Sequence, residues 1–411
     1  MATSGHARWR RRPESVPVVV VGAAGTLVAG VVIGLLVDTS ALVDSGGYLF
    51  GASLLLAVGL YGSTYAIDLD ALRADLTGVL AAVTVGVLLK AALIAGTMLL
   101  VFHRPQALVL GIAVAQIDPL SVAALGRNGR MSPRARSLLT AWASFDDPMT
   151  VLLTLYLAGY AYTAAGHTGA PEVSGDGGGG YLTGLGLNAA LLAGVLLLWW
   201  AGRRVTAVVR GAGSLRRARA AATVVLVVAM LVLAAAQQLM LAVALAGLVV
   251  RSAVLTKGLE RAVGGAFLAA FLALGLLLAH GVAWWPGFVL GAAAFGAQAV
   301  VALGVMPLFV RDLERRDRIA LGLGQQNGIT AVLIALTLER DFPGTAATVG
   351  PAVITVNVLH GVSQALLARS ARTRRPVVGR ELPVAHARHF VHERKALDEK
   401  LDDKLDKKSV A

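Results

Sequence analysis

The sequence predicts an all-α membrane protein in which about twelve transmembrane helices form two inverted-topology repeats, with two broken helices. Three observations predict this fold. Of the 411 residues, 56% are hydrophobic and only 15% are charged. Apolar runs of about 20 residues, the length that a helix needs to cross the hydrocarbon layer, recur along the chain. Two of these runs are interrupted by proline, glycine and polar residues, which membrane proteins tolerate only where the backbone is buried or lines a wet cavity.

The apolar runs predict the individual spans in order. They lie near residues 16–37, 48–67, 77–102, 106–125, 137–160, 181–202, 219–237, 239–256, 262–281, 284–308, 317–339 and 346–369. Basic residues gather before the first span and after every second one, whereas the opposite connections carry little more than Arg104 and Arg340. Because arginine and lysine concentrate in cytoplasmic loops, this alternation predicts that both termini are cytoplasmic.

The same pattern divides the chain into three parts and limits its partners. We expect a cytoplasmic N-terminal segment (1–15), a transmembrane domain (16–369) in the plasma membrane and a charged cytoplasmic tail (370–411). The net charge of +13 is explained by arginines beside the lipid headgroups, so we expect no nucleic-acid partner. No cofactor is expected, and the absence of cysteine excludes disulfides and thiolate chemistry. The glycine-rich residues 161–180 are expected to form a flexible external loop.

Asp146 and Asp147 are adjacent inside the predicted span 137–160. Each ionised side chain at the centre of a membrane helix costs roughly 2.5–3.5 kcal/mol, so two together predict a site for cations or protons. Successive residues on a helix point about 100° apart, and the two carboxylates are therefore expected to have different roles.

Two other spans are predicted to be broken. In span 106–125, Pro119 follows Asp118, and proline removes a backbone donor and disrupts the preceding turn. In span 317–339, glycines and amides occupy the segment around Gln326 and Asn327. The two spans are an odd number of helices apart and therefore enter the membrane from opposite sides. Paired interruptions of this kind predict an inverted repeat with a binding site at the midplane.

Four stretches of residues 16–369 together resemble the monovalent cation:proton antiporter family. Gln116, Ile117, Asp118, Pro119 and Leu120 resemble its Thr-Asp-Pro segment; Ser144, Phe145, Asp146 and Asp147 its Asn-Asp or Asp-Asp pair; Ala246, Gly247, Leu248 and Val249 its Ala-Gly-Leu-Val run; and 321–328 its second broken helix.

The resemblance implies a function and roles for the aspartates. Asp147 would bind the cation and protons in competition, with Asp118 beside it, and the two broken helices would cross. Members with an aspartate at the place of Asp146 tend to be electrogenic, and the resemblance also implies a homodimer.

The chain departs from the family at three places. Gly62 stands where some members have a glutamate. Gln298 stands where relatives have a lysine or arginine, and Trp142 stands where many have a glutamate.

Lys90 is a candidate replacement for the missing basic residue. It lies about midway along span 77–102, roughly 20 Å from either end by helix rise, which is farther than a lysine easily reaches. The hypothesis is that Lys90 pairs with Asp146 or Asp118. The alternatives are that it lines a wet funnel without a partner, or that the span is shifted so that Lys90 reaches an interface.

Four neutral residues complete the expected site. Ser144, Thr150, Gln326 and Asn327 could be cation ligands, although each of the two amides could equally bridge helices. The sequence therefore predicts a secondary transporter, not an enzyme, that exchanges Na⁺ or K⁺ for protons, with Asp147 and Asp118 as cation ligands. A cation channel without proton coupling remains an alternative. An intramembrane aspartyl protease, with Asp118 facing Asp147, is a second one.

Overall fold

The computed structural model describes residues 16–37, 41–67, 76–118, 131–174, 180–208, 213–310 and 313–373. Every regular element in these ranges is helical, and seven of the helices are long and apolar enough to cross a membrane. The chain divides into two compact units, 1–363 and 364–411. Pro119, the N-terminal segment 1–15 and the tail beyond residue 373 lie outside the described residues.

The first spans follow the apolar runs. Helix α1 (Val16–Leu36) is followed by α2 (Gly46–Tyr65), and the third run contains α4 (Leu76–Ala81), the π-helix η1 (Ala82–Gly86) and α5 (Val87–Phe102) without a gap. Helix α6 (Gln106–Ala113) comes next and covers only the first part of the predicted span 106–125. The early end of α6 leaves the backbone before Asp118 non-helical, as the sequence predicts.

Helix α8 (Pro133–Ala164) carries both adjacent aspartates and is longer than predicted. It begins after Ser132, whose side chain accepts a hydrogen bond from the Ala135 N–H, and Pro133 fits the first turn because no backbone donor is needed there. Helix α8 and the 3₁₀ turn η3 (Glu172–Ser174) both extend into the expected flexible loop. Asp341 holds that turn by accepting the N–H groups of Glu172 and Val173 at 2.9 Å. The expectation of a flexible loop over 161–180 is therefore wrong for 161–164, which continue α8, and for 172–174, which form η3.

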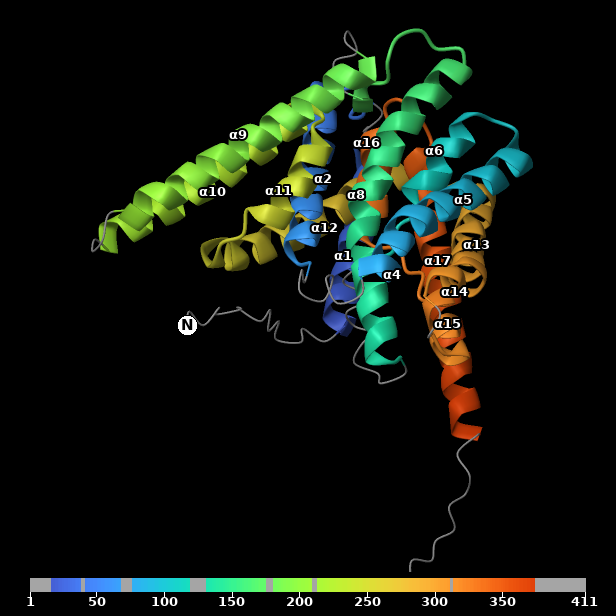
Figure 1. Cartoon of the computed structure of the whole chain (residues 1–411). Helices are drawn as coiled ribbons and strands as arrows, with labels where there is room; N and C mark the ends of the chain where they lie inside the picture. Colours follow the sequence, from blue (N-terminus) through green and yellow to red (C-terminus); the bar gives the residue numbers. More distant parts are fainter. Residues whose placement is uncertain are drawn as a thin grey trace, which may run out of the picture. The chain divides into compact units, whose positions relative to one another are not determined.

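The helices that follow pack as a layer along one side of the first unit. Helices α9 (Gly180–Val208) and α10 (Gly213–Gln237) lie side by side (Figure 1), and α9 also contacts α11 (Met240–Val249). Helix α11 packs against α2, and α1 packs along α12 (Ala253–Leu278). Helices α1 and α12 approach closely at Gly30 and Gly275, since a Cβ on either glycine would meet backbone atoms of the other helix.

The predicted span 239–256 is wrong as a single helix. Helix α11 ends at Val249, Ser252 is extended (φ −147°, ψ 134°), and α12 already begins at Ala253 rather than near residue 262. The backbone groups freed by this break find partners on α2: the Tyr61 hydroxyl donates to the Val250 carbonyl and the Tyr65 hydroxyl donates to the Ser252 carbonyl, both at 2.7 Å. The apolar character of the span as a whole does not reveal the break, because Arg251 and Ser252 interrupt a run that is otherwise mostly apolar.

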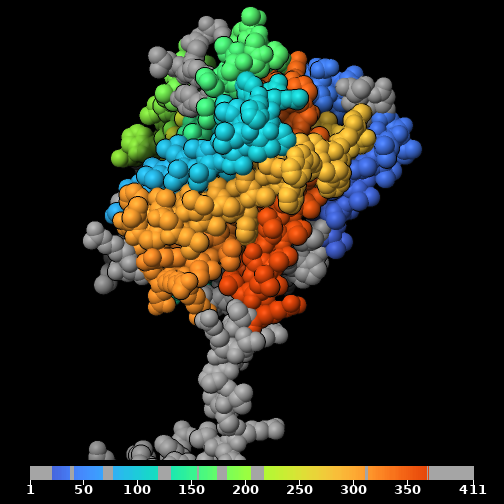
Figure 2. Space-filling model, turned by 90° about the vertical axis from the view of Figure 1, so that its right-hand side faces the viewer, coloured from blue at the N-terminus to red at the C-terminus, as the bar shows by residue number. Residues whose placement is uncertain are grey.

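The last helices supply the second interruption. Helix α13 (Trp284–Val300), the π-helix η4 (Val301–Val305) and α14 (Met306–Phe309) form one run that lies against α5 and η1. Figure 2 shows this orange surface directly beside the light-blue to cyan surface of the third run. Helix α15 (Arg315–Gly322) and α16 (Ile329–Leu338) are separated by non-helical residues, and α17 (Thr345–Thr373) follows. The break between α15 and α16 is the one that the sequence predicts.

Candidate ion-binding site

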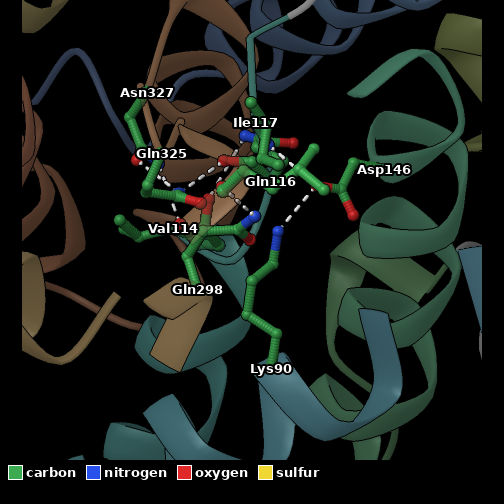
Figure 3. Close-up of polar contacts among 10 residues, drawn as sticks. Lys90, Val114, Gln116, Ile117, Asp146, Gln298, Gln325 and Asn327 are labelled. Carbon is green, nitrogen blue, oxygen red and sulfur yellow. Dashed lines mark hydrogen bonds and ion pairs between the residues drawn. The ribbon is translucent and has the colours of Figure 1, made fainter. Parts of the chain in front are cut away.

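The two helix interruptions contact each other directly. The Asp118 N–H donates to the Gln326 carbonyl at 2.8 Å. Two side chains of the second interruption donate to carbonyls of the first: Gln325 Nε2 to Gln116 at 2.9 Å, and Asn327 Nδ2 to Val114 at 2.8 Å (Figure 3). These hydrogen bonds replace the intrahelical ones that each break removes, which is the condition for non-helical backbone at membrane depth.

Asp146 faces α5 and the end of α6. Its Oδ2 accepts a hydrogen bond from Lys90 Nζ at 2.7 Å and another from the Ile117 N–H at 3.0 Å. Figure 3 shows the Lys90 ammonium pointing at the Asp146 carboxylate. Both side chains of the ion pair are 0% exposed. The Lys90 ammonium also lies 5.5 Å from the centre of the Trp142 ring, so the aromatic face contributes a second favourable contact. The pairing of Lys90 with Asp146 that the sequence suggests is present.

Asp147 points toward different elements. Its carboxylate is buried, and its Oδ2 accepts a hydrogen bond from the Thr330 hydroxyl on α16 at 3.2 Å. Ser63 on α2 also contacts Asp147, and the charges of Asp118 and Asp146 act on it. The adjacent aspartates therefore have separate environments, as the helix geometry predicts: Asp146 is paired with a lysine, whereas Asp147 accepts a hydrogen bond from a threonine hydroxyl.

Asp118 is placed by the close approach of the second interruption. A Cβ on Gly328 would lie 2.5 Å from the Asp118 Cγ and 2.8 Å from its Oδ1. Only glycine leaves room there for the carboxyl group, since real Cβ atoms do not come so close to other heavy atoms. The glycine that ends this interruption thus lets Asp118 approach the start of α16, where Thr330 meets Asp147.

Some of the neutral residues predicted for the site donate hydrogen bonds to backbone carbonyls, whereas others have a buried oxygen without a hydrogen-bond partner. Ser144 donates to the Thr140 carbonyl of its own helix at 2.7 Å. Asn327 bridges the interruptions through its Nδ2, which donates to the Val114 carbonyl, and its Oδ1 accepts a hydrogen bond from Gln325 Nε2. Gln298 donates to the Leu321 carbonyl at 3.1 Å. Asn327 is thus a structural amide in this conformation.

Several buried oxygens near the interruptions have no hydrogen-bond partner among the described residues. They are Gln116 Oε1, Asp146 Oδ1, Asp147 Oδ1, Thr150 Oγ1, Gln298 Oε1, Gln325 Oε1 and Gln326 Oε1. Leaving a buried acceptor unsatisfied costs about 1–3 kcal/mol, so a concentration of such atoms requires an explanation. Oxygen atoms of this kind are the ligands that hard cations prefer, and they can also bind water or protons.

Helix α17 supports the second interruption in a way that the sequence does not suggest. Asn357 Nδ2 donates to the Asn327 carbonyl at 3.1 Å, and His360 Nδ1 lies 2.8 Å from the Leu323 carbonyl. Thr330 was also not among the predicted site residues. An asparagine or histidine inside an apolar helix is a usable signal for such a contact. A threonine is a much weaker signal, because its hydroxyl commonly bonds to its own helix.

The comparisons with known proteins agree with this geometry. Residues 5–368 match the family described as the transmembrane sodium/hydrogen exchanger. The fold is similar to that of the sodium proton antiporter MjNhaP1 from Methanocaldococcus jannaschii at pH 8, with a TM-score of 0.57 at 16% identity over 85% of this chain and 99% of that one. An electron-microscopy structure of the same antiporter has a TM-score of 0.56 at 16% identity over 90% and 93%. Comparison with curated proteins gave no significant match. Because the family match spans nearly the whole chain, this protein belongs to the sodium/hydrogen exchanger family of membrane transporters and is not an enzyme.

Proposed function

We propose that this protein exchanges a monovalent cation, Na⁺ or K⁺, for protons, and that the two compete for Asp147. The observation that carries the proposal is the meeting of two interrupted helices beside three aspartates, of which Asp146 and Asp147 are fully buried. In this arrangement the carboxylate oxygens, the Thr150 hydroxyl and the amide oxygens of the interruptions offer a cation a set of hard ligands without the removal of any existing hydrogen bond.

Competition follows from the charges. Neighbouring carboxylates in a low dielectric cannot all ionise cheaply, so the cluster retains a proton unless a cation is present. A bound cation favours the ionised carboxylates and expels protons, whereas protons arriving from the other side expel the cation. Exchange then requires only that the site opens alternately to the two faces, by movement of one helix bundle against the other.

Lys90 has a distinct part in this proposal. By neutralising Asp146 it leaves Asp147 and Asp118 as the carboxylates that a cation can neutralise. Gln298 stands where relatives have a lysine or arginine, and Lys90 would supply that positive charge from another helix. Electrogenic exchange is expected because the chain resembles family members that have an aspartate at the place of Asp146.

The proposal includes the arrangement in the membrane. We propose twelve spans in two inverted repeats, both termini in the cytoplasm, and a homodimer in the plasma membrane. Supporting features are the reciprocal contact of the two interruptions and the packing of α5 against α13, which would be related positions in the two repeats. The alternation of basic loops supports the orientation.

The test is a vesicle assay. Wild-type protein is reconstituted into liposomes with an inside-acid pH gradient and a trapped pH-sensitive dye, and the membrane potential is clamped at zero. Addition of Na⁺, K⁺ or Li⁺ separately reports which cation collapses the gradient. Wild type should collapse it with at least one cation, Asp147→Asn should not, and Glu172→Gln, an exposed external carboxylate, should behave as wild type.

The same assay separates exchange from a channel. A channel would pass cation current but leave the clamped pH gradient in place. Persistence of the gradient with all three cations, in vesicles shown to contain correctly folded protein, would rule out the antiport proposal.

A further inference from the structure

Trp142 on α8 is completely buried beside the ion pair of the candidate site, and it is not among the groups that hold the cation or the protons. The Lys90 ammonium lies 5.5 Å from the centre of its ring and 2.7 Å from Asp146 Oδ2. Trp142 and Asp146 are four residues apart on one helix, so they lie on the same face of α8. Lys90 reaches them from α5, and its charge is therefore shared between an aromatic face and a carboxylate.

The indole N–H of Trp142 and one oxygen of Asp146 complement each other. Trp142 Nε1 and Asp146 Oδ1 are both buried, and neither makes a well-aligned hydrogen bond to a residue in the described ranges. The indole N–H nevertheless lies within reach of the Asp146 carboxyl group. Leaving either atom unsatisfied in the interior is unfavourable, so a rotation of the ring that joins them is favoured. Trp142 thus contacts both members of the ion pair, Lys90 with its face and Asp146 with its edge.

The π-helix η1 leaves room for the Trp142 ring. Its last residue is Gly86, and a Cβ there would lie 3.1 Å from Trp142 Cζ2 and 3.4 Å from Trp142 Cε2. Contacts this close force one of the two neighbours to move by a few tenths of an ångström. The segment that leads into the lysine-bearing helix α5 therefore also shapes the space that the ring occupies.

A second carboxylate competes for the lysine. The charge of Asp147 acts on Lys90, and Asp147 directly follows Asp146 in the chain. An ammonium that moved from Asp146 toward Asp147 would supply there the positive charge that a transported cation brings. Contacts that hold Lys90 on the Asp146 side therefore keep Asp147 available to the cation.

We propose that Trp142 is a positioning residue that holds the Lys90 ammonium against Asp146 and away from Asp147. Its ring face attracts the ammonium, and its indole N–H steadies the carboxylate that the ammonium faces. The effect on the cation rests on the proposed function, because it requires that the cation binds at Asp147. The contact with the ion pair itself does not depend on any transported ion.

The first test measures the apparent KM for the cation that collapses the pH gradient in the vesicle assay. Trp142→Leu removes both the aromatic face and the N–H, and it should raise this KM about tenfold with a smaller fall in the maximal rate. Trp142→Phe keeps an aromatic face and should raise the KM only about twofold to threefold. A fall in the maximal rate with an unchanged KM in both variants would overturn the proposal, because damaged packing alone explains that result.

Gly86→Val displaces the ring while Trp142 itself is kept, and it decides the question if Trp142→Leu fails to fold. It should raise the same KM by several-fold. Gly96→Val, on α5, is the matched control and should leave the KM unchanged, since a Cβ at residue 96 meets nothing within 4 Å. A wild-type KM in folded Gly86→Val protein would contradict the positioning role.

A second measurement requires no transport. The loss of unfolding temperature caused by Trp142→Leu is compared in wild type and in a background without the two charges, Lys90→Met with Asp146→Asn. If the ring stabilises the ion pair, the loss should be clearly larger when the charges are present. Equal losses in the two backgrounds would show that Trp142 only fills space, and the proposal would be wrong. A wild type that exchanges no cation in vesicles would instead refute the proposed function, and the comparison of unfolding temperatures would still decide the role of Trp142.

Discussion

At the scale of single residues, the buried ion pair between Lys90 and Asp146 is the strongest constraint on the candidate site. Both side chains are fully buried, and Lys90 has no second carboxylate at hydrogen-bond distance in the described contacts. Removing one partner of a buried pair strands the other charge and typically costs about 3–5 kcal/mol, whereas removing both can be almost neutral.

A double-mutant cycle tests this pair. Lys90→Met and Asp146→Asn should each lower the unfolding temperature of the purified protein, and the double variant should recover most of the loss. Asparagine retains an oxygen that can accept the Ile117 N–H, so the loss in that variant reports mainly the stranded lysine. Additive destabilisation in the double variant would show that the two charges do not depend on each other.

Thr330 gives a second residue-scale prediction. Its hydroxyl donates to Asp147, and Thr330→Val removes that donor while keeping the side-chain shape. A lost hydrogen bond of about 1 kcal/mol corresponds to a change of roughly fivefold in an equilibrium constant, so the apparent affinity for the cation should shift by several-fold. Thr330→Ser, which keeps the hydroxyl, should remain near wild type. Equal cation affinity in all three proteins would remove Thr330 from the site.

What the sequence reveals about individual residues depends on how unusual each one is in a membrane. Lys90 is conspicuous because a lysine at the middle of a span needs a partner, and its partner was among the expected carboxylates. Thr330 and Ser63 are not conspicuous, because hydroxyl side chains occur throughout membrane helices and usually bond to their own backbone. Their contribution depends on tertiary contacts that no local pattern encodes.

At the scale of the helices, Gly328 connects the second interruption with Asp118. An added Cβ must displace either the Asp118 carboxyl group or the start of α16. Gly328→Ala should therefore reduce both exchange activity and the unfolding temperature. Gly264→Ala, on α12, is the matched control because a Cβ there meets nothing within 4 Å. If Gly328→Ala transports ions as well as the control does, the close approach is not required.

The helix breaks were predictable where the sequence carries polar or glycine residues inside an apolar run. The end of α6 before Asp118 and the gap between α15 and α16 both have this signature. The break after Val249 carries only Arg251 and Ser252 as a signal, and it is stabilised from outside by Tyr61 and Tyr65 on another helix. The turn at Glu172 depends in the same way on Asp341, which lies far along the chain.

At the scale of the whole molecule, the order and spacing of four motifs identified the family, because together they describe one arrangement of two crossing breaks. The family match over residues 5–368 confirms that identification. Composition and loop charge predict a membrane protein and an orientation, but the number of spans is less securely encoded. Span 239–256 shows why: hydropathy measures the total apolar length, whereas the position of a break depends on which neighbours can satisfy the freed backbone groups.

The central claim is that a cation and protons compete for the same buried carboxylates, and proton release on cation binding tests it most directly. Purified wild type in weakly buffered detergent is titrated with NaCl, KCl or choline chloride while a dye reports pH. Wild type should release protons saturably with Na⁺ or K⁺ but not with choline, and folded Asp147→Asn should release almost none. Cation binding without proton release in wild type, or the same release in Asp147→Asn, would contradict the account.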